Sequence, residues 1–171
     1  MNVAFFHGLE SPAVSEKNGV LDSIFTTVYA PAMDYRDPAL FKKVLQEIKN
    51  QKIDLLIGSS MGGWFAYCLS SVTGIPTLLF NPATNRRSFD PDVVIGSQSS
   101  QHTVILGKKD TVVIPEKTQE WFKENSVKSY SIYWENMGHR IPINVFKKWC
   151  LKVNKGPGKV MEFKDFMLTQ S

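Results

Sequence analysis

The sequence predicts an α/β fold, a three-layer α/β/α sandwich built around a mainly parallel sheet of six strands. Short apolar runs rich in β-branched and aromatic residues alternate with longer amphipathic stretches, which is the pattern of parallel strands joined by helices. The chain has 171 residues, of which 43% are hydrophobic and 21% are charged. This length and composition suit one globular domain with a well-formed core.

Six short runs have the composition and length of strands, with turn-forming residues between them. They occupy residues 3–7, 26–30, 53–57, 76–80, 102–106 and 130–134. The run at 53–57 is continuously apolar, which is typical of a central strand that is buried on both faces.

Five helices are predicted between and after these strands. Ser11 as N-cap, followed by Pro12 at the first helical position, predicts a helix that runs to about residue 25. Asp37 and Pro38 are expected to start the second helix, whose apolar residues recur at helical spacing. The other three are expected from the turn at 58–63 to about residue 71, over 115–125 and over 142–153.

The long segment between the fourth and fifth strands, residues 83–101, has no predicted helix or strand. It is too short for a lid of several helices, so we expect no large lid and an open, shallow pocket. We assign residues 1–153 to one domain and residues 154–171 to a Gly- and Pro-containing linker and a basic C-terminal tail. Within that tail, residues 160–168 are amphipathic but predict no definite element.

Charge and cysteine content argue against several classes of protein. Residues 140–171 carry seven Lys and Arg against two acidic residues, and therefore hold the whole basic excess of a chain whose net charge is +4. Because this charge is not interleaved with exposed aromatic residues on a recognisable nucleic-acid-binding module, we expect no nucleic-acid partner, although a weak interaction with another anionic partner stays open. No run reaches the ~20 apolar residues of a transmembrane segment, and the N-terminus lacks the features of a signal peptide. With Cys68 and Cys150 expected as buried thiols, we predict a cytoplasmic protein.

The segment from Gly58 to Gly62 carries the strongest chemical signal. It reads Gly-Ser-Ser-Met-Gly and lies directly between a buried strand and a helix, so Ser60 is the centre of a Gly-x-Ser-x-Gly turn. Such a turn is so sharp that the residues two before and two after the nucleophile must be nearly free of side chains. Ser59 fails this test because larger residues would occupy the two glycine positions. Ser60 is therefore the predicted nucleophile.

A serine nucleophile needs a base, and the chain has three histidines, at positions 7, 102 and 139. His139 follows the sixth strand, so it is expected at the same edge of a parallel sheet as Ser60. His102 begins a strand and is expected at the opposite edge, ~15 Å away. His7 ends the first predicted strand and is expected to brace the loop that follows it. His139 is therefore the predicted base.

A carboxylate is needed to orient the imidazole of the base. Asp110 follows the fifth strand, and the order Ser, Asp, His along the chain is typical of hydrolases with a Gly-x-Ser-x-Gly turn. Asp34, after the second strand, and Glu135, at the sixth, are alternatives that the sequence leaves open. Position and order favour Asp110.

Two backbone N–H groups are predicted to bind the oxyanion that forms during acyl transfer. One belongs to Met61, at the start of the helix after the nucleophile. The other belongs to Leu9, in the loop after the first strand, where Gly8 permits a tight turn. Tyr35 and Trp64 are candidates for lining the pocket, although packing is the better-supported role for Trp64. No residues have the spacing of a metal site.

Five motifs follow the predicted strands. They are His7-Gly8-x-x-Ser11-Pro12, Gly58-Ser59-Ser60-Met61-Gly62-Gly63, Asn81-Pro82-Ala83, Gly107-x-x-Asp110 and Gly138-His139. As a set they resemble the small α/β-hydrolase esterases of the YqiA type, over roughly residues 3–150. The resemblance implies a minimal α/β-hydrolase fold, a small-molecule ester substrate, and hydrolysis of carboxylic esters or thioesters with no metal or organic cofactor.

The sequence therefore predicts a serine esterase that acts on small or medium acyl groups through Ser60, His139 and Asp110. Two alternatives stay open. An acyltransferase or a peptidase would use the same three residues, whereas a non-catalytic binding protein would keep only the fold. The second is less well supported because no member of the triad is missing.

Overall fold

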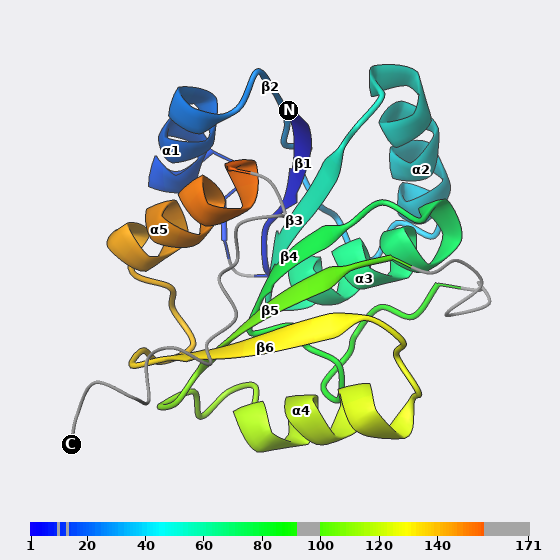
Figure 1. The fold of residues 1–171 in the computed structure, drawn as a ribbon. Helices are drawn as coiled ribbons and strands as arrows, with labels where there is room; N and C mark the ends of the chain where they lie inside the picture. The colour runs from blue at the N-terminus through cyan, green and yellow to red at the C-terminus, as the bar shows by residue number, and fades with distance from the viewer. Residues whose placement is uncertain (10, 13, 92–99, 156–171) are drawn as a thin grey trace.

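The computed structural model describes residues 1–9, 11–12, 14–91 and 100–155. These residues form six strands and five helices (Figure 1). The strands are β1 (Asn2–Phe6), β2 (Thr27–Tyr29), β3 (Leu55–Ser59), β4 (Thr77–Phe80), β5 (His102–Gly107) and β6 (Tyr130–Glu135). The helices are α1 (Glu16–Ile24), α2 (Leu40–Gln51), α3 (Met61–Thr73), α4 (Pro115–Glu124) and α5 (Ile143–Asn154).

The six strands form one parallel sheet in the order β2-β1-β3-β4-β5-β6. The register places Ser59 beside Phe80 and Phe80 beside Ile105, and it pairs Gly107 with Glu135 at the end of β6. Because all strands run in the same direction, the loops that follow them leave from one edge of the sheet. The predicted six-stranded parallel sheet is confirmed, and this edge carries the candidate site.

Helices cover both faces of the sheet, α1 and α5 on one face and α2, α3 and α4 on the other (Figure 1). Neighbouring residues of β1 point to opposite layers, as the twofold period of a strand requires. Phe5 packs against Phe146 of α5, with ring centroids 5.6 Å apart, and Phe6 packs against Phe65 of α3 at 5.2 Å. The predicted three-layer sandwich is confirmed.

Helix α3 lies deep in the molecule, since every residue from Met61 to Ser71 is buried. A helix that is apolar nearly all round needs protein on all sides, and here it packs against β3, β4 and β1. Its first turn is therefore fixed relative to three central strands, and Ser60 is the residue that precedes it.

The predicted start of the first helix, with Ser11 as its N-cap, is wrong. Helix α1 begins at Glu16, and Ser15 is its N-cap. The Ser15 N–H donates to the Asn18 side-chain oxygen at 2.8 Å, and the Asn18 N–H donates to the Ser15 carbonyl at 3.0 Å. These bonds satisfy the free end of the helix. Ser11 instead donates its N–H to the Gly8 carbonyl at 3.2 Å, so it belongs to a turn in the preceding loop.

The second helix begins at Leu40, slightly later than predicted. Asp37 and Pro38 form the turn before it, where a side-chain oxygen of Asp37 accepts the Ala39 N–H at 2.8 Å. A short Asp side chain that binds the backbone two residues on stabilises a turn in place of a helical residue.

The segment after β4 packs on α3. Its described part, residues 83–91, contains no helix or strand. Phe89 packs against Phe65 of α3, with ring centroids 5.2 Å apart, and the Trp64 indole N–H donates to the Phe89 carbonyl at 2.9 Å. The described residues therefore form no large lid, in agreement with the prediction.

Several further predictions concern the chain ends and the cysteines. Cys68 in α3 and Cys150 in α5 are buried free thiols, as predicted. From residue 156 on, the predicted linker and the amphipathic segment at 160–168 lie outside the described residues. Among the helices that the structure describes, none has the length and apolar character needed to cross a membrane.

Candidate active site

Ser60 occupies a strained turn between β3 and α3. Its φ of 55° and ψ of −121° are unfavourable for a residue that carries a side chain. Three backbone hydrogen bonds hold this conformation. The Ser60 N–H donates to the Phe80 carbonyl of β4 at 2.9 Å, and the Ser60 carbonyl accepts the N–H groups of Trp64 at 3.1 Å and Ala83 at 3.0 Å. Strain maintained by neighbouring structure is typical of functional residues.

The two glycines of the turn are required for different reasons. A Cβ on Gly58 would overlap the carbonyl group of Gly62, so the turn itself excludes a side chain there. A Cβ on Gly62 would overlap the carbonyl group of Phe6 at the end of β1. The second glycine therefore also lets the start of α3 lie directly against the neighbouring strand.

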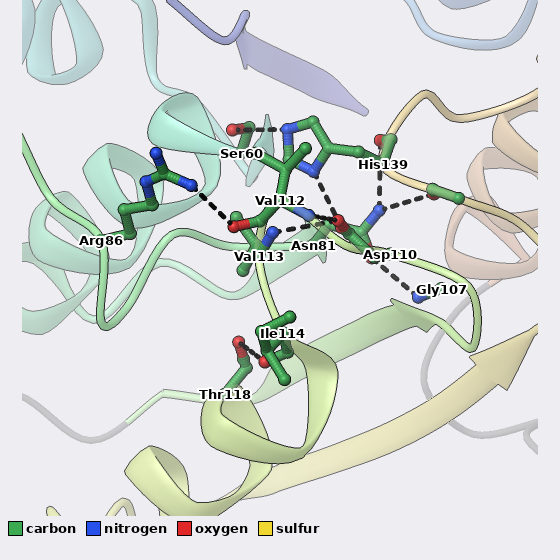
Figure 2. A network of polar contacts seen from close by, with 11 residues as sticks. Ser60, Asn81, Arg86, Gly107, Asp110, Val112, Val113, Ile114, Thr118 and His139 are labelled. Atoms are coloured by element: carbon green, nitrogen blue, oxygen red, sulfur yellow. Dashed lines mark hydrogen bonds and ion pairs between the residues drawn. The ribbon is translucent and has the colours of Figure 1, made fainter.

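The structure brings Ser60, His139 and Asp110 into one chain of hydrogen bonds (Figure 2). Nε2 of His139 lies 3.1 Å from Oγ of Ser60, and Nδ1 lies 2.8 Å from Oδ2 of Asp110. Because an ionised carboxylate only accepts hydrogen bonds, the ring proton belongs on Nδ1, and the lone pair of Nε2 faces the serine hydroxyl. This geometry suits proton transfer from Ser60 to His139.

The side-chain carboxylate of Asp110 is fully enclosed and makes three hydrogen bonds. Its other oxygen, Oδ1, accepts the N–H groups of Val112 at 2.8 Å and Val113 at 2.9 Å. Burial raises the pKa of the Asp110 carboxyl, but hydrogen bonds from His139, Val113 and Val112 outweigh it and hold the pKa below its ordinary value. Its side chain has 0% exposure, whereas the His139 side chain is 25% exposed. The Asp110 carboxylate is thus ionised and shielded from solvent, and the His139 ring is accessible.

The two alternative acids are hydrogen-bonded to other partners. Asp34 is exposed and pairs with the Arg36 guanidinium at 3.1 Å. Glu135 accepts the Lys148 ammonium at 2.5 Å and the Trp149 indole N–H at 2.7 Å. Neither is bonded to a histidine.

The two remaining histidines have all their ring nitrogens engaged. In His7, Nδ1 donates to the Gly8 carbonyl at 2.8 Å and Nε2 accepts the Met33 N–H at 3.3 Å, so the ring braces the loop after β1. His102 begins β5 at the opposite edge of the sheet, where Nδ1 lies 2.9 Å from the Thr77 hydroxyl and Nε2 lies 3.4 Å from the Ser100 hydroxyl. Burial lowers the pKa of His102 to about 4.

The loop after β1 lies against Ser60. A Cβ on Gly8 would be 3.3 Å from the Ser60 Cβ and 3.8 Å from the Ser60 Oγ, so a side chain there would crowd the hydroxyl. Leu9 follows with 57% exposure of the residue. Neither the Leu9 N–H nor the Met61 N–H donates to another group within the part of the chain that the structure describes. Among the described residues both N–H groups are therefore without an acceptor; Met61 follows Ser60 directly, and Leu9 follows Gly8, which lies against Ser60.

The two candidate pocket residues are both buried. Trp64 has 0% exposure, and Arg87 covers its ring with the guanidinium 4.4 Å from the ring centroid. Tyr35 is 7% exposed, and its hydroxyl donates to the His7 carbonyl at 2.5 Å. The structure thus places Trp64 in the core and gives Tyr35 a supporting contact with the loop that carries Gly8.

Large apolar side chains are exposed on the loops around Ser60, Asp110 and His139. Four of the five large apolar residues exposed in the described chain lie on loops at the site edge: Leu9, Val14, Val112 and Ile114. A cavity of about 180 Å³ lies between the loop after β1 and the residues after His139. Its described lining is Phe5, His7, Ser11, Pro12, Ser15, Glu16, Lys17, Ile141 and Ile143. Within the described residues, no three side chains of the metal-binding types gather into a site.

Asn81 is a residue of the site whose role the sequence did not reveal. It follows β4, and its side chain is bonded to the loops that carry both Asp110 and His139 (Figure 2). The only indication in the sequence was that the Asn81-Pro82-Ala83 motif follows the carboxyl end of a predicted strand, the edge where the site was expected. An Asn after a strand is ordinarily a turn former, so the motif alone predicted no tertiary contact.

Comparison with solved structures shows the same fold in several hydrolases. An α/β-superfamily hydrolase from Xanthomonas campestris is 16% identical, with a TM-score of 0.71, and the match covers 90% of this chain and 96% of that one. A monoacylglycerol lipase from Paleococcus ferrophilus is 14% identical, with a TM-score of 0.65 and coverage of 90% and 92%. A carboxylesterase from Bacillus cereus is 16% identical, with a TM-score of 0.63 and coverage of 90% and 87%.

At these identities the similarity shows the fold, which is that of the α/β-hydrolases, as predicted. No curated protein matches the chain in sequence. A family model does match it, over residues 3–111, which is more than half of the chain and includes both Ser60 and Asp110. The chain therefore belongs to the uncharacterised protein family UPF0227.

Proposed function

We propose that this protein is a serine hydrolase that cleaves carboxylic esters or thioesters of small or medium acyl groups. The observation that carries the proposal is the chain of hydrogen bonds from the Ser60 hydroxyl through the His139 ring to the Asp110 carboxylate, at 3.1 and 2.8 Å. Nucleophile, base and orienting acid are then all within bonding distance of their partners.

In the acylation half of the reaction, Oγ of Ser60 attacks the ester carbonyl carbon while its proton moves to Nε2 of His139. The tetrahedral intermediate collapses when His139 gives that proton to the leaving alcohol or thiol, and the acyl group stays bonded to Ser60. Asp110 accepts the Nδ1–H bond throughout and stabilises the imidazolium that forms. Its lowered pKa keeps it ionised for this role.

In the deacylation half, water takes the place of the leaving group. His139 removes a proton from the water as its oxygen attacks the acyl carbonyl, and a second tetrahedral intermediate forms. This intermediate expels Oγ of Ser60, which recovers its proton from His139. The carboxylic acid is released, and the enzyme returns to its starting state.

The oxyanion of both intermediates needs donors that are already in place. We assign this role to the backbone N–H groups of Met61 and Leu9, which have no other acceptor among the described residues. The Met61 N–H is at the first position of α3, where the helix dipole also favours negative charge. Gly8 leaves room beside the Ser60 hydroxyl, and the Tyr35 hydroxyl and the His7 ring hold the loop.

The exposed apolar residues on the loops around the triad support a small or medium apolar acyl group. Val112 and Ile114 offer contacts to an acyl chain there. The cavity of about 180 Å³ beside the loop after β1 is not assigned to the acyl group, because its described lining includes Glu16 and Lys17 but none of the triad residues. The monoacylglycerol lipase and the carboxylesterase of the same fold make ester cleavage the chemistry to test first.

The test uses p-nitrophenyl esters graded from acetate through butyrate and octanoate to palmitate, together with a fluorophosphonate that labels activated serines. We expect hydrolysis that is fastest at short or medium chains and labelling of the wild-type protein. Ser60→Ala should abolish labelling and lower kcat by at least ~10³-fold.

Ser59→Ala is the matched control, because Ser59 is the neighbouring serine and is buried in β3 with 5% exposure. This variant should remain labelled. Failure of the wild type to react with the probe and with every ester, or labelling that survives in Ser60→Ala, would refute the proposal.

A further inference from the structure

Asn81 lies at the centre of the site edge without touching the reacting atoms. It follows the last residue of β4, is 1% exposed, and adopts a left-handed backbone conformation with φ of 43°. Its N–H donates to the Ile105 carbonyl at 2.9 Å, which continues the pairing of β4 with β5 by one residue. Asn tolerates this conformation better than most residues with a side chain.

The side-chain amide of Asn81 uses both its donor and its acceptor. Oδ1 accepts the Gly107 N–H at 2.7 Å, and Nδ2 donates to the carbonyl groups of Gly138 and His139, each at 3.2 Å. Gly107 ends β5 and begins the loop that leads to Asp110, whose N–H donates to the Gly107 carbonyl at 3.0 Å. One buried amide thus joins the loop of the acid to the backbone of the base.

The two loops also contact each other directly. The Lys108 N–H donates to the Glu135 carbonyl at 2.9 Å, and the Lys109 N–H donates to the Met137 carbonyl at 3.0 Å. A Cβ on Gly107 would be 2.7 Å from the Met137 carbonyl oxygen, so the loops approach as closely as their backbones allow. The Asn81 amide, which follows β4, adds a side-chain contact to each of these two loops.

The residues next to Asn81 hold the nucleophile. The Phe80 carbonyl accepts the Ser60 N–H at 2.9 Å, and the Ala83 N–H donates to the Ser60 carbonyl at 3.0 Å. Residues 80–83 are therefore bonded to the backbone of Ser60, while the Asn81 side chain is bonded to the backbone of His139 and of Gly107. This short segment is a common support for all three members of the triad.

We propose that Asn81 is a positioning residue that sets the location of His139 and of the Asp110 loop relative to Ser60. This inference rests on the proposed serine hydrolase function, because its consequence for turnover requires a working triad. The amide acts through the backbone, and a shift of His139 by a fraction of an ångström would lengthen its contact with the Ser60 hydroxyl. Misplacement of about 1 Å costs on the order of 10²-fold in rate.

The choice of Asn over similar residues follows from its three contacts. An Asp would keep the acceptor for the Gly107 N–H but would turn an oxygen toward two carbonyl groups, which is repulsive. A Gly would keep the left-handed backbone without the amide. Asn81→Gly therefore removes all three side-chain contacts with little change in backbone conformational energy. Asn81→Asp makes the two contacts of Nδ2 repulsive in a side chain of nearly the same shape.

The experiment measures kcat and KM on the best ester of the panel, together with thermal unfolding and the downfield proton resonance of His139 Nδ1–H, which His139→Ala assigns. For Asn81→Gly and Asn81→Asp we expect kcat to fall about 10- to 100-fold. We expect KM to change less than about threefold, because binding of the ester is not the altered step. The Nδ1–H resonance should shift or broaden below the unfolding transition.

Thr84→Val is the matched control. Thr84 is in the same segment with 0% exposure, and its hydroxyl has no hydrogen-bond partner within the described residues. This variant should keep the wild-type kcat and the wild-type resonance. Wild-type kcat and resonance in folded Asn81→Gly or Asn81→Asp would overturn the inference, as would a loss of activity that only follows the loss of folded protein.

The resonance separates this inference from the proposed function, because it reports the contact between His139 and Asp110 without any substrate. If the wild type hydrolyses no ester, the proposed function fails, and an altered resonance in the Asn81 variants still supports positioning by the amide. If the wild type is active but the variants keep both its kcat and its resonance, only the positioning role fails.

Discussion

Nδ1 of His139 lies 2.8 Å from a carboxylate, that of Asp110, whose side chain has no exposed surface. This enclosure makes the pair sensitive to the identity of the acid. An exposed ion pair would contribute ~0–1 kcal/mol to the free energy of unfolding. The shielded carboxylate has a further effect, because it determines which ring nitrogen of His139 carries the proton.

Asp110→Asn should lower kcat by about 10³- to 10⁴-fold while the protein stays folded. The amide oxygen of the new residue can still accept the N–H groups of Val112 and Val113. The amide nitrogen, however, would donate to Nδ1 of His139, and the ring proton would move to Nε2, where it blocks transfer from Ser60. Steady-state kinetics and thermal unfolding measure the two effects.

Asp34→Asn is the control for this substitution, because it changes an exposed carboxylate that is bonded to Arg36. It should leave kcat within about twofold of the wild type. Equal losses in the two variants, or full activity in Asp110→Asn, would contradict the assignment of the acid.

Gly62→Ala should destabilise the protein by about 3 kcal/mol or more, because the added Cβ overlaps the backbone of Phe6 in β1 and neither the strand nor α3 is free to move. Gly19→Ala, in α1, adds the same methyl group where nothing lies within 4 Å. That control should be neutral or stabilise the helix by about 0.5–1 kcal/mol. Chemical denaturation measures both, and similar stability of the two variants would show that the close approach to β1 is not rigid.

Val112→Ser should reduce the preference for longer acyl chains. Val112 is 45% exposed and follows Asp110 closely, so its side chain lies beside the triad (Figure 2). Loss of one partly covered apolar contact, worth about 1 kcal/mol, should lower the octanoate-to-acetate ratio of kcat/KM about fivefold. Leu151→Ser, in α5 and with 40% exposure, is the control and should leave the ratio unchanged. An unchanged ratio in Val112→Ser would place the acyl chain elsewhere.

The free energy of unfolding should fall between pH 8 and pH 5 because of His102. Burial lowers the pKa of His102 to about 4 in the folded protein from the ordinary 6.5. Below the ordinary value the unfolded chain binds a proton that the folded protein does not, so stability is lost as the pH falls toward the folded-state pKa, by about 2 kcal/mol at pH 5.

His102→Gln removes this titration and should flatten the difference between pH 8 and pH 5 in urea unfolding experiments. The lowered pKa of Asp110 acts in a more acidic range, because the stabilisation that it provides is lost only as the pH falls through the ordinary range of a carboxyl group. An equal pH dependence in wild type and His102→Gln would refute the assignment to His102.

The start of α1 shows how two N-cap motifs in one segment compete. Ser11-Pro12 and Ser15 with Asn18 both have the residues of a helix N-terminus. The second pair caps α1, whereas Ser11 belongs to a turn in the loop whose Gly8 lies against Ser60. The contact of this loop with the turn after β3, about 50 residues away in the chain, cannot be read from the N-terminal segment alone.

Tyr35 shows the same limit for a side chain. Its position past a strand suggested a pocket residue, but packing against Phe65 and Phe89 buries the ring, and its hydroxyl reaches the His7 carbonyl. Whether an aromatic residue faces a pocket or the core depends on which helix lies over it, and this is a property of the assembled layers.

The sequence by itself determined the parallel sheet and the strained turn at Ser60, because the periodicity of the strands and the need for glycine at both ends of the turn are properties of adjacent residues. Only the tertiary structure decided which carboxylate faces His139, and it alone gave Asn81 its contacts with both loops. Those contacts join segments that follow β3, β4, β5 and β6, and the register of four parallel strands sets their distances. The free energy that fixes this register comes from the burial of both faces of the sheet, to which residues throughout the chain contribute.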